Sequence, residues 1–249
     1  MKITVITATF NSAKTLGDCL DSVRQQSFRD IEHVVIDGAS KDGTLALLAA
    51  RRDDIAVLVS EPDHGIYDAL NKGIAMATGD IIGFLHSDDF YPSTDVLAKV
   101  AQAFADRQVD AVYGDLEYVS KRHASKVIRR WKAGQFKRRD LFLGWMPPHP
   151  TLFVRRGIYA QIGGFDTRFR IAADYDSVLR MFSRPGFRAV YLPWVMVRMR
   201  VGGVSNRSLA NILHKSRQDL AALRQTGVGG VFSLLAKNLR KIPQFFRPK

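Results

Sequence analysis

Short apolar runs alternate with helical patterns through the first half of the 249-residue chain. Turn-forming residues separate these runs from stretches in which apolar side chains recur at helical spacing. Strand and helix alternating in this order is typical of a mostly parallel sheet covered by helices, so an α/β fold is predicted. Strands are expected over residues 3–9, 31–36, 55–60 and within 79–89, with helices over residues 12–26 and 66–77 and through Leu45 and Leu48.

Acidic residues follow three of these expected strands. Asp37 ends the second, Glu61 and Asp63 follow the third, and Asp88 and Asp89 follow the fourth. Asp is an ordinary helix cap, which is the alternative explanation for any one of them. Because the carboxyl ends of parallel strands meet at one edge of a sheet, where open α/β sheets bind ligands, the three acidic ends together favour a ligand site.

The pair Asp88 and Asp89 indicates what such a site would hold. Two adjacent carboxylates repel each other, so they must be solvated or share a cation. Carboxylate oxygens are suitable ligands for a hard divalent ion, and an ion at the end of a buried strand would hold phosphates. The sequence therefore predicts a metal site at this pair.

The middle of the chain is less regular and more basic. Strands are expected at residues 109–114 and 117–119, followed by a stretch at residues 121–139 with nine Lys and Arg residues and no acid. Three prolines make residues 144–151 rigid, which would fix the position of His149. A purely structural histidine is equally consistent with this loop.

Two further helices are expected after the proline loop. The first covers residues 155–162 and ends at Gly163 and Gly164, and the second opens at residue 172. Asp174 and Asp176 fall in the first turn of the second helix. Early Asp residues favour a helix start through the helix dipole, which is the structural explanation for both.

The formal charge of +13 is unevenly distributed. Residues 1–120 contain 10 Lys and Arg against 19 Asp and Glu, residues 121–197 contain 16 against 4, and residues 198–249 contain 11 against 1. This asymmetry indicates an anionic partner of the second half, such as nucleic acid, a lipid headgroup surface or a phosphorylated substrate. The alternative is a solvated basic face.

Composition limits the remaining possibilities. An apolar content of 46% is enough for one globular domain, here expected to carry a tail. Cys19 has no partner cysteine in the chain, which fits a reducing compartment and excludes a metal cluster built from cysteines. The apolar start is too short for a signal peptide, and no apolar run approaches the roughly 18 residues needed to cross a bilayer, so any membrane association is expected to be peripheral.

Six segments, taken in order, resemble the family 2 glycosyltransferases, which are inverting sugar transferases with a single Rossmann-like GT-A domain, and among them the bacterial polysaccharide-biosynthesis type. The segments are Thr9-Phe10-Asn11, residues 37–44, residues 63–73, Asp88-Asp89, residues 163–166, and residues 173–176 with Arg180. The resemblance covers most of residues 1–205 and implies a GT-A domain there. Its nucleotide- and metal-binding half would be residues 1–120, and its acceptor and catalytic half residues 121–205.

The resemblance also implies roles for single residues. Asp37 would accept hydrogen bonds from the nucleotide base. Asp88 and Asp89 would bind Mg²⁺ or Mn²⁺, with Asp88 the direct ligand, and Asp174 would be the catalytic base that takes the proton of the acceptor hydroxyl. Further candidates for binding the nucleotide-sugar donor are Thr9, Asn11, Asp68, Lys72 and His149. Asp68 and Lys72 lie four residues apart, so an ordinary helix ion pair is the favoured alternative for them.

The chain departs from the family pattern at four positions. His86 stands where many members have an Asp two positions before the metal ligand, which removes the group implied to contact the ribose. Ala173 replaces an acidic residue before the base and leaves Asp174 as the only acid at that place. Ala8 replaces a frequent Pro and Gly38 a frequent second Asp, and neither change removes a group that the chemistry requires.

Residues 206–249 are expected to form a basic amphipathic helical tail. Residues 209–224 have helical periodicity, and after Gly227 to Gly230 apolar and basic residues alternate again. This pattern favours binding to an anionic membrane surface over a helix packed back on the domain. Residues 198–205 resemble the mobile segment that follows the base in related enzymes and closes over the donor. The protein is thus expected in the cytoplasm, at the inner face of the plasma membrane.

Three functions are compatible with these observations. The favoured one is a metal-dependent transferase that moves a sugar from a nucleotide donor, by default a UDP-sugar, to a lipid-linked oligosaccharide or polysaccharide. A sugar nucleotidyltransferase would need a Gly-rich basic loop after the first strand, where Thr9 to Ser12 stand instead. A nucleic-acid-binding module would explain the basic half, but no recognition motif accompanies the charge, so no nucleic acid partner is expected.

Overall fold

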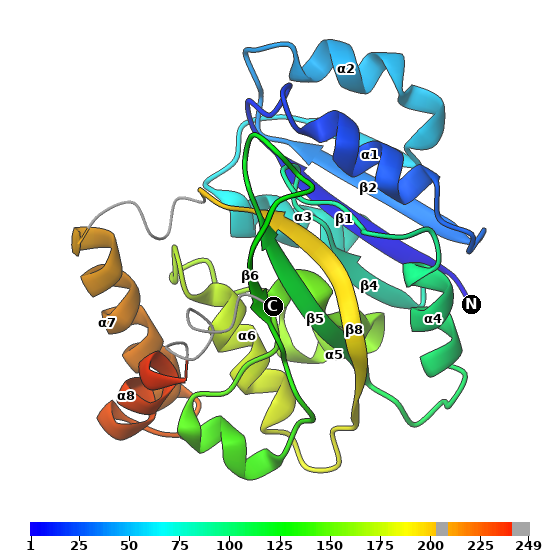
Figure 1. Ribbon diagram of the computed structural model, residues 1–249. Helices are drawn as coiled ribbons and strands as arrows, with labels where there is room; N and C mark the ends of the chain where they lie inside the picture. The colour runs from blue at the N-terminus through cyan, green and yellow to red at the C-terminus, as the bar shows by residue number, and fades with distance from the viewer. Residues whose placement is uncertain (203–208, 241–249) are drawn as a thin grey trace.

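The computed structural model describes residues 1–202 and 209–240, and it confirms the mixed α/β class with a mostly parallel sheet. Eight strands form one sheet in the order β3-β2-β1-β4-β7-β5-β6, with β8 paired to β5 (Figure 1). β1 to β4 run parallel to one another, whereas β7 is antiparallel to both β4 and β5. The strands are β1 (Ile3–Thr9), β2 (Ile31–Asp37), β3 (Val57–Ser60), β4 (Ile81–Phe84), β5 (Ala111–Val119), β6 (Val127–Trp131), β7 (Phe153–Arg155) and β8 (Ala189–Arg200).

Helices cover both faces of the sheet. They are α1 (Leu16–Arg24), α2 (Thr44–Ala50), α3 (Ile66–Met76), α4 (Val96–Ala103), α5 (Arg156–Ile162), α6 (Ala173–Phe182), α7 (Leu209–Gln225) and α8 (Val231–Leu239). Short 3₁₀ helices lie at η1 (Arg52–Asp54), η2 (Arg138–Leu143) and η3 (His149–Thr151). Successive side chains of a strand point to opposite faces, so Val5 belongs to the core under α1 and α4 while Ile6 belongs to the core under α3 and α6.

Close packing holds the first helical layer against the sheet. Gly73 of α3 lies directly over Ile6 of β1, in a position where a Cβ atom would collide with the isoleucine side chain. The backbone of α3 therefore lies closer to β1 than it could if Gly73 carried a side chain. This contact fixes α3, and with it the residues at the start of that helix, relative to the carboxyl end of β1.

The second half of the sheet differs from the sequence expectation. The two strands expected at residues 109–114 and 117–119 are one continuous strand, β5, which pairs with β8 along its length. β6, β7 and β8 were not expected. The prediction of a mobile segment starting at Arg198 is wrong for residues 198–201, because Arg198 and Arg200 belong to β8 and the Val201 N–H donates to the Val119 carbonyl at 3.0 Å. The rest of that segment, residues 203–205, lies outside the described residues.

The two C-terminal helices pack on the domain. α7 lies beside α6, and its Ala222 and Leu223 are fully buried in the core that α3 and α6 share. α8 contacts both α7 and η2, and Figure 1 shows α7 and α8 together on the same side of α6. The inner faces of both helices therefore pack on the domain. This is the alternative that the sequence analysis did not favour. No helix within the described residues is both long and apolar enough to span a membrane.

Candidate active site

The candidate site lies where β1, β2 and β4 end. β1 and β2 pair in parallel with Thr9 opposite Asp37, so both residues reach the same edge of the sheet. Thr9 is buried, and its hydroxyl has no hydrogen-bond partner among the residues that the structure describes. A buried hydroxyl of this kind is available to a ligand at the strand end.

Asp37 and Asn11 organise the first two loops of this edge. The Asp37 carboxylate is fully buried and accepts hydrogen bonds from the Ser40 N–H at 3.0 Å, the Ser40 hydroxyl at 2.5 Å and the Ser60 hydroxyl at 2.7 Å. Asn11 adopts a positive φ of 49°, and its side-chain oxygen accepts from the Lys41 N–H at 2.9 Å. Both side chains thus hold loops in place, and their lone pairs are largely engaged within the protein.

Asp63 is the acidic residue that faces the first loop most closely. Its carboxylate oxygen would lie 2.5 Å from a Cβ atom placed on Gly38, and the Phe10 ring lies 3.4 Å from the same point. The glycine therefore makes room for the Asp63 carboxylate. Phe10 is 61% exposed at this position, which leaves a flat aromatic surface beside the carboxylate. The sequence indicated Asp63 only as one of several acids and gave no role to Phe10.

Lys72 is held by acids of its own neighbourhood. Its Nζ lies 2.7 Å from Glu61, 3.0 Å from the Pro62 carbonyl and 3.8 Å from Asp68. The hydrogen bond to Glu61 is the main cause of its raised pKa. The Asp68 carboxylate accepts in turn from the His64 N–H at 3.0 Å. The ion pair expected from the spacing is present, but Glu61 is the closer partner, and together these contacts fix the turn between β3 and α3.

Asp88 and Asp89 differ in their surroundings. Asp88 is partly exposed at the carboxyl side of β4, whereas Asp89 is fully buried, and one of its carboxylate oxygens has no hydrogen-bond partner among the described residues. Burial raises the pKa of Asp89 well above its usual value, and the neighbouring charge of Asp88 adds to this. Arg200 of β8 crosses this loop: its guanidinium donates to the Asp88 carbonyl at 2.7 Å and pairs with Asp18, while its N–H donates to Asp89 at 3.2 Å.

These carboxylates fit a hard divalent ion. Asp88 presents oxygen ligands at the sheet edge, and the unpartnered oxygen of Asp89 is a second carboxylate atom in the same loop. Within residues 1–202 and 209–240, no group of three or more His, Cys, Asp or Glu side chains forms a complete metal cage. This is the donor set expected for Mg²⁺ or Mn²⁺ held by one or two carboxylates together with phosphate oxygens.

Asp174 lies in the first turn of α6 and is partly buried. Its carboxylate accepts hydrogen bonds from the Tyr175 N–H at 2.8 Å and from the Tyr67 hydroxyl at 3.4 Å. The single proton of the Tyr67 hydroxyl is shared between this carboxylate and the Ile171 carbonyl, whose oxygen is closer, at 2.9 Å. Burial, and then the charge of Asp174, raise the pKa of Tyr67 well above its usual value, so the phenol stays protonated as a donor.

The tail also contacts the segment before Asp174. Gln218 of α7 accepts hydrogen bonds through its side-chain oxygen from the N–H groups of Ile171, at 2.9 Å, and Ala172, at 3.2 Å. α7 therefore satisfies two backbone donors at the start of α6. Tyr67 and Gln218 are functional candidates that the sequence analysis missed. Tyr67 stood inside a recognised segment without an assigned role, and nothing local marks Gln218.

A second set of contacts fixes the turn between α5 and α6. Asn71 of α3 exchanges two hydrogen bonds with the backbone of Phe165, of 2.9 and 2.8 Å. Gly164 has a φ of 71°, and a Cβ atom on it would lie 2.6 Å from the Asn71 side-chain oxygen. Arg180 pairs with the buried Asp176 at 2.7 Å and also donates to the Gly164 carbonyl at 2.8 Å. Asp176 therefore supports the turn, and Asp174 is the helix-start acid that reaches the site.

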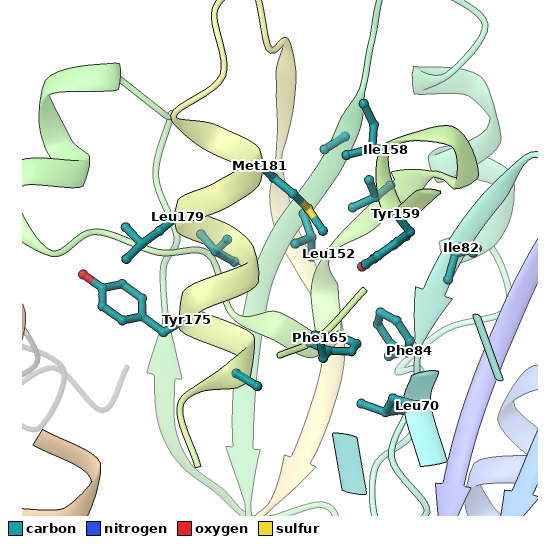
Figure 2. Close-up of a cluster of buried hydrophobic side chains, with 14 of the residues drawn as sticks. Leu70, Ile82, Phe84, Leu152, Ile158, Tyr159, Phe165, Tyr175, Leu179 and Met181 are labelled. Carbon is teal, nitrogen blue, oxygen red and sulfur yellow. The ribbon is translucent and has the colours of Figure 1, made fainter. Parts of the chain in front are cut away.

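Two histidines lie between the metal end and the base end of the site. His149 is 6% exposed and packs on Phe84, with ring centroids 5.2 Å apart, and edge-to-face on Phe165 at 5.5 Å. Figure 2 shows Phe84 and Phe165 close together at the Leu70 end of the buried cluster. Both ring nitrogens of His149 lack a hydrogen-bond partner among the described residues. Burial lowers the pKa of His149 to about 4, so the imidazole is neutral at neutral pH.

The second histidine, His86, is influenced by the charges of both Asp88 and Asp174. Its ring centroid lies 6.1 Å from that of His149. Burial lowers the pKa of His86, and the charges of Asp88 and then Asp174 oppose this shift. The charges of both carboxylates therefore act on one imidazole, whose ring lies beside that of His149. Lys72, Asp68 and Asn11 are engaged in holding the surrounding loops.

Known proteins resemble this chain along most of its length. The model of the family "Glycosyl transferase family 2" matches residues 4–189. A "PGL/p-HBAD biosynthesis glycosyltransferase" of Mycobacterium bovis is 35% identical over 207 residues, which cover 81% of this chain and 78% of the relative.

Two solved structures share the fold. S. aureus TarS, residues 1–349, in complex with UDP-GlcNAc, has a TM-score of 0.69 at 19% identity and matches 98% of this chain and 78% of that one. The mannosyltransferase PcManGT of Pyrobaculum calidifontis, in complex with GDP-Man and Mn²⁺, has a TM-score of 0.61 at 22% identity, with 99% and 81% covered.

Proposed function

Because the chain belongs to glycosyl transferase family 2, we propose that it transfers a sugar, with inversion, from a UDP-sugar to a hydroxyl group of a lipid-linked oligosaccharide or a polysaccharide. The reaction would use Mg²⁺ or Mn²⁺ and take place at the cytoplasmic face of the membrane. The nucleotides and the metal named with the solved relatives, UDP-GlcNAc in one and GDP-Man with Mn²⁺ in the other, support a nucleotide-sugar donor and a divalent ion. Family membership argues against the nucleic-acid-binding and nucleotidyltransferase alternatives.

One observation carries this proposal. Asp88 and Asp174 come from segments 86 residues apart, yet both lie close enough to His86 to oppose the lowering of its pKa by burial. A carboxylate suited to a metal and a carboxylate suited to proton transfer therefore flank one site. An inverting transfer needs this arrangement, because the diphosphate leaves from one side of the sugar while the acceptor attacks from the other.

The residues divide the reaction between them. The acceptor oxygen attacks the anomeric carbon of the donor, the bond from that carbon to the diphosphate oxygen breaks, and the acceptor proton goes to the Asp174 carboxylate. The Tyr67 hydroxyl, which donates to Asp174 at 3.4 Å, orients this carboxylate. The neutral imidazoles of His86 and His149 offer hydrogen bonds to the donor between the two carboxylates. A divalent ion held by Asp88, when bound, neutralises the charge that develops on the diphosphate.

A nucleotide-binding measurement tests the donor site. The melting temperature is followed with UDP, GDP and dTDP, each with and without Mn²⁺, for the wild type and for Asp88→Asn. A ligand at about 100 times its dissociation constant adds about 2.7 kcal/mol of stability, which corresponds to a shift of about 5 °C or more for a chain of this size. We expect this shift with UDP and Mn²⁺, and its loss in Asp88→Asn.

Matched variants separate the roles. Asp53→Asn makes the same change at an exposed position in η1 and is expected to keep the full shift. Asp174→Asn is expected to keep the UDP shift and to lose transfer by a factor of about a hundred or more, as for removal of a general base. Absence of any nucleotide-dependent shift in the wild type would refute the donor site.

A further inference from the structure

Helix α8 is oriented with its polar side towards the protein and its apolar side towards solvent. Its inward residues Ser233 and Lys237 are 4% and 2% exposed. Four of its five large apolar residues are 54%, 73%, 57% and 63% exposed; they are Val231, Phe232, Leu235 and Leu239, here called the α8 face, while the fifth, Leu234, packs against the core. At about 100° per residue these four side chains cover one side of the helix, opposite Ser233 and Lys237. A surface helix normally has the reverse orientation.

Specific contacts keep α8 in this orientation. The Lys237 ammonium lies 2.8 Å from the buried carboxylate of Asp219 on α7 and 3.1 Å from the centre of the Tyr175 ring. Gly144, at the end of η2, allows the α8 backbone to come close, since a Cβ atom there would lie 2.7 Å from the Ser233 carbonyl. Rotating the helix to bury the α8 face would leave the Asp219 and Lys237 charges unpaired in the interior, which is strongly unfavourable.

The apolar surface continues on the neighbouring segment. η2 packs against α8, and its Phe142 and Leu143 are 54% and 37% exposed. In Figure 1, α8 and the green segment that contains η2 lie at the same end of the molecule. Scattered single apolar residues on a surface need no explanation, but a cluster on two adjoining elements marks a binding surface.

Positive charge surrounds this cluster. Lys137, Arg138 and Arg139 are exposed on or next to η2, and Arg240 is exposed at the end of α8, where it pairs with Asp140 of η2 at 3.5 Å. A pocket of about 250 Å³ opens beside α8 between Trp131 and Trp145, and its cationic lining residues are Lys132, Lys237 and Arg240. The one acidic residue in the last 52 residues of the chain is Asp219, which is buried and paired with Lys237. An apolar face with a cationic rim complements a lipid bilayer with negatively charged headgroups.

We infer that the α8 face inserts into the surface of an anionic bilayer. This inference rests on the proposed function, takes the lipid-linked form of its acceptor, and identifies the surface that brings the enzyme to that lipid. A second copy of the chain fits less well, because a symmetric dimer through this face would bring Lys137, Arg138, Arg139 and Arg240 of one copy towards the same residues of the other.

The position of the face relative to the base supports the same partner. α7, to which Lys237 ties α8, holds the backbone just before Asp174 through Gln218. Lys237 itself lies on the ring of Tyr175, the residue after Asp174. α8 therefore attaches to the domain directly behind the start of α6. A membrane bound by α8 lies next to the helix that carries the base, as a lipid-linked acceptor requires.

Vesicle sedimentation tests the inference without requiring catalysis. The full-length protein is mixed with vesicles of phosphatidylcholine alone, or with about one third phosphatidylglycerol. We expect binding to the anionic vesicles, at least about a tenfold loss of affinity in Phe232→Ser, and a larger loss in the double variant Phe232→Ser/Leu235→Ser. Leu45→Ser, which makes the same change at a residue 40% exposed on α2, is the matched control and is expected to bind as the wild type does.

Each outcome decides the question. Because Phe232 and Leu235 are exposed, both variants are expected to keep the melting temperature and the UDP-dependent shift of the wild type. Absence of wild-type binding to anionic vesicles, or unchanged binding in the double variant, would overturn the inference. A wild-type dimer in sedimentation equilibrium that becomes a monomer in Phe232→Ser would assign the face to a second copy. Failure of the proposed function would appear separately, as a missing nucleotide shift.

Discussion

Gln218 is expected to position the catalytic base, although it belongs to the C-terminal helices. Its side-chain oxygen accepts from the N–H groups of Ile171 and Ala172, directly before the helix turn that contains Asp174. Gln218→Met keeps the length of the side chain and removes this acceptor. Each of the two hydrogen bonds contributes about 1 kcal/mol, so the free energy of unfolding is expected to fall by about 2 kcal/mol.

The same loss sets the expected effect on the reaction. If the full 2 kcal/mol is lost from the transition state, the turnover number falls about thirtyfold, since about 1.4 kcal/mol corresponds to a factor of ten. The Michaelis constant for the nucleotide donor is expected to change little, because Gln218 does not lie at the strand ends that hold Asp37 and Asp88. The assay measures release of the nucleoside diphosphate, and urea unfolding of the same variant measures stability.

Two comparisons make this prediction refutable. Gln225→Met introduces the same side chain at an exposed position of the same helix, near Asp166, and is expected to keep the wild-type turnover number. Gln218→Glu retains the acceptor oxygen and should recover part of the lost stability. A Gln218→Met enzyme that is destabilised but turns over at the wild-type rate would show that α7 supports the fold without positioning the base.

Three further predictions concern stability. Lys237→Met leaves the buried Asp219 charge unpaired and is expected to lower the free energy of unfolding in urea by about 3–5 kcal/mol. Lys237→Met combined with Asp219→Leu should have a free energy of unfolding close to that of the wild type. Equal losses in the single and the double variant would contradict a dominant charge effect. The pKa of His33 falls from an unfolded value of about 6.5 to about 4 through burial, so the unfolded chain binds the proton first on acidification. The contribution of His33 to stability is complete above about pH 6.5 and is lost as the pH falls towards 4, by about 2 kcal/mol at pH 5. This part of the decrease should disappear in His33→Gln, while the part due to His149 remains. Gly164→Ala is expected to cost about 2 kcal/mol through its φ of 71° and its contact with Asn71, and unchanged melting would refute this.

The sequence predicted those parts of the fold whose residues carry a local signal. β1, β2 and α3 were predicted to within a residue or so, because strand-like apolar runs and helical periodicity are properties of neighbouring residues. β6 was missed because Val127–Trp131 is short, contains two arginines and has no fully buried residue. β7 spans three residues, too few for any periodicity to show.

The same distinction applies to the site. Asp88 and Asp174 stand in recognisable segments, and the charges of both oppose the lowering of the pKa of His86 by burial. Tyr67 and Gln218 act on Asp174 or its helix from residues 107 and 44 positions away, distances over which the sequence carries no local pattern. The packing of the tail's inner face on the domain was not predicted for a similar reason: the Asp219 to Lys237 pair joins two helices and cannot be detected from the periodicity of either one.

The close approach of Gly38 and Asp63 limits how these two strand ends can change during evolution. The two positions compete for one space, so a side chain can be added at the end of β2 only if the Asp63 carboxylate withdraws from it. Loss of an acidic residue at one strand end and gain of one at the other would leave the net charge of this edge of the sheet unchanged. In related chains, an acidic residue at the position of Gly38 should therefore accompany a smaller or uncharged residue at that of Asp63, as a correlated exchange rather than two independent substitutions.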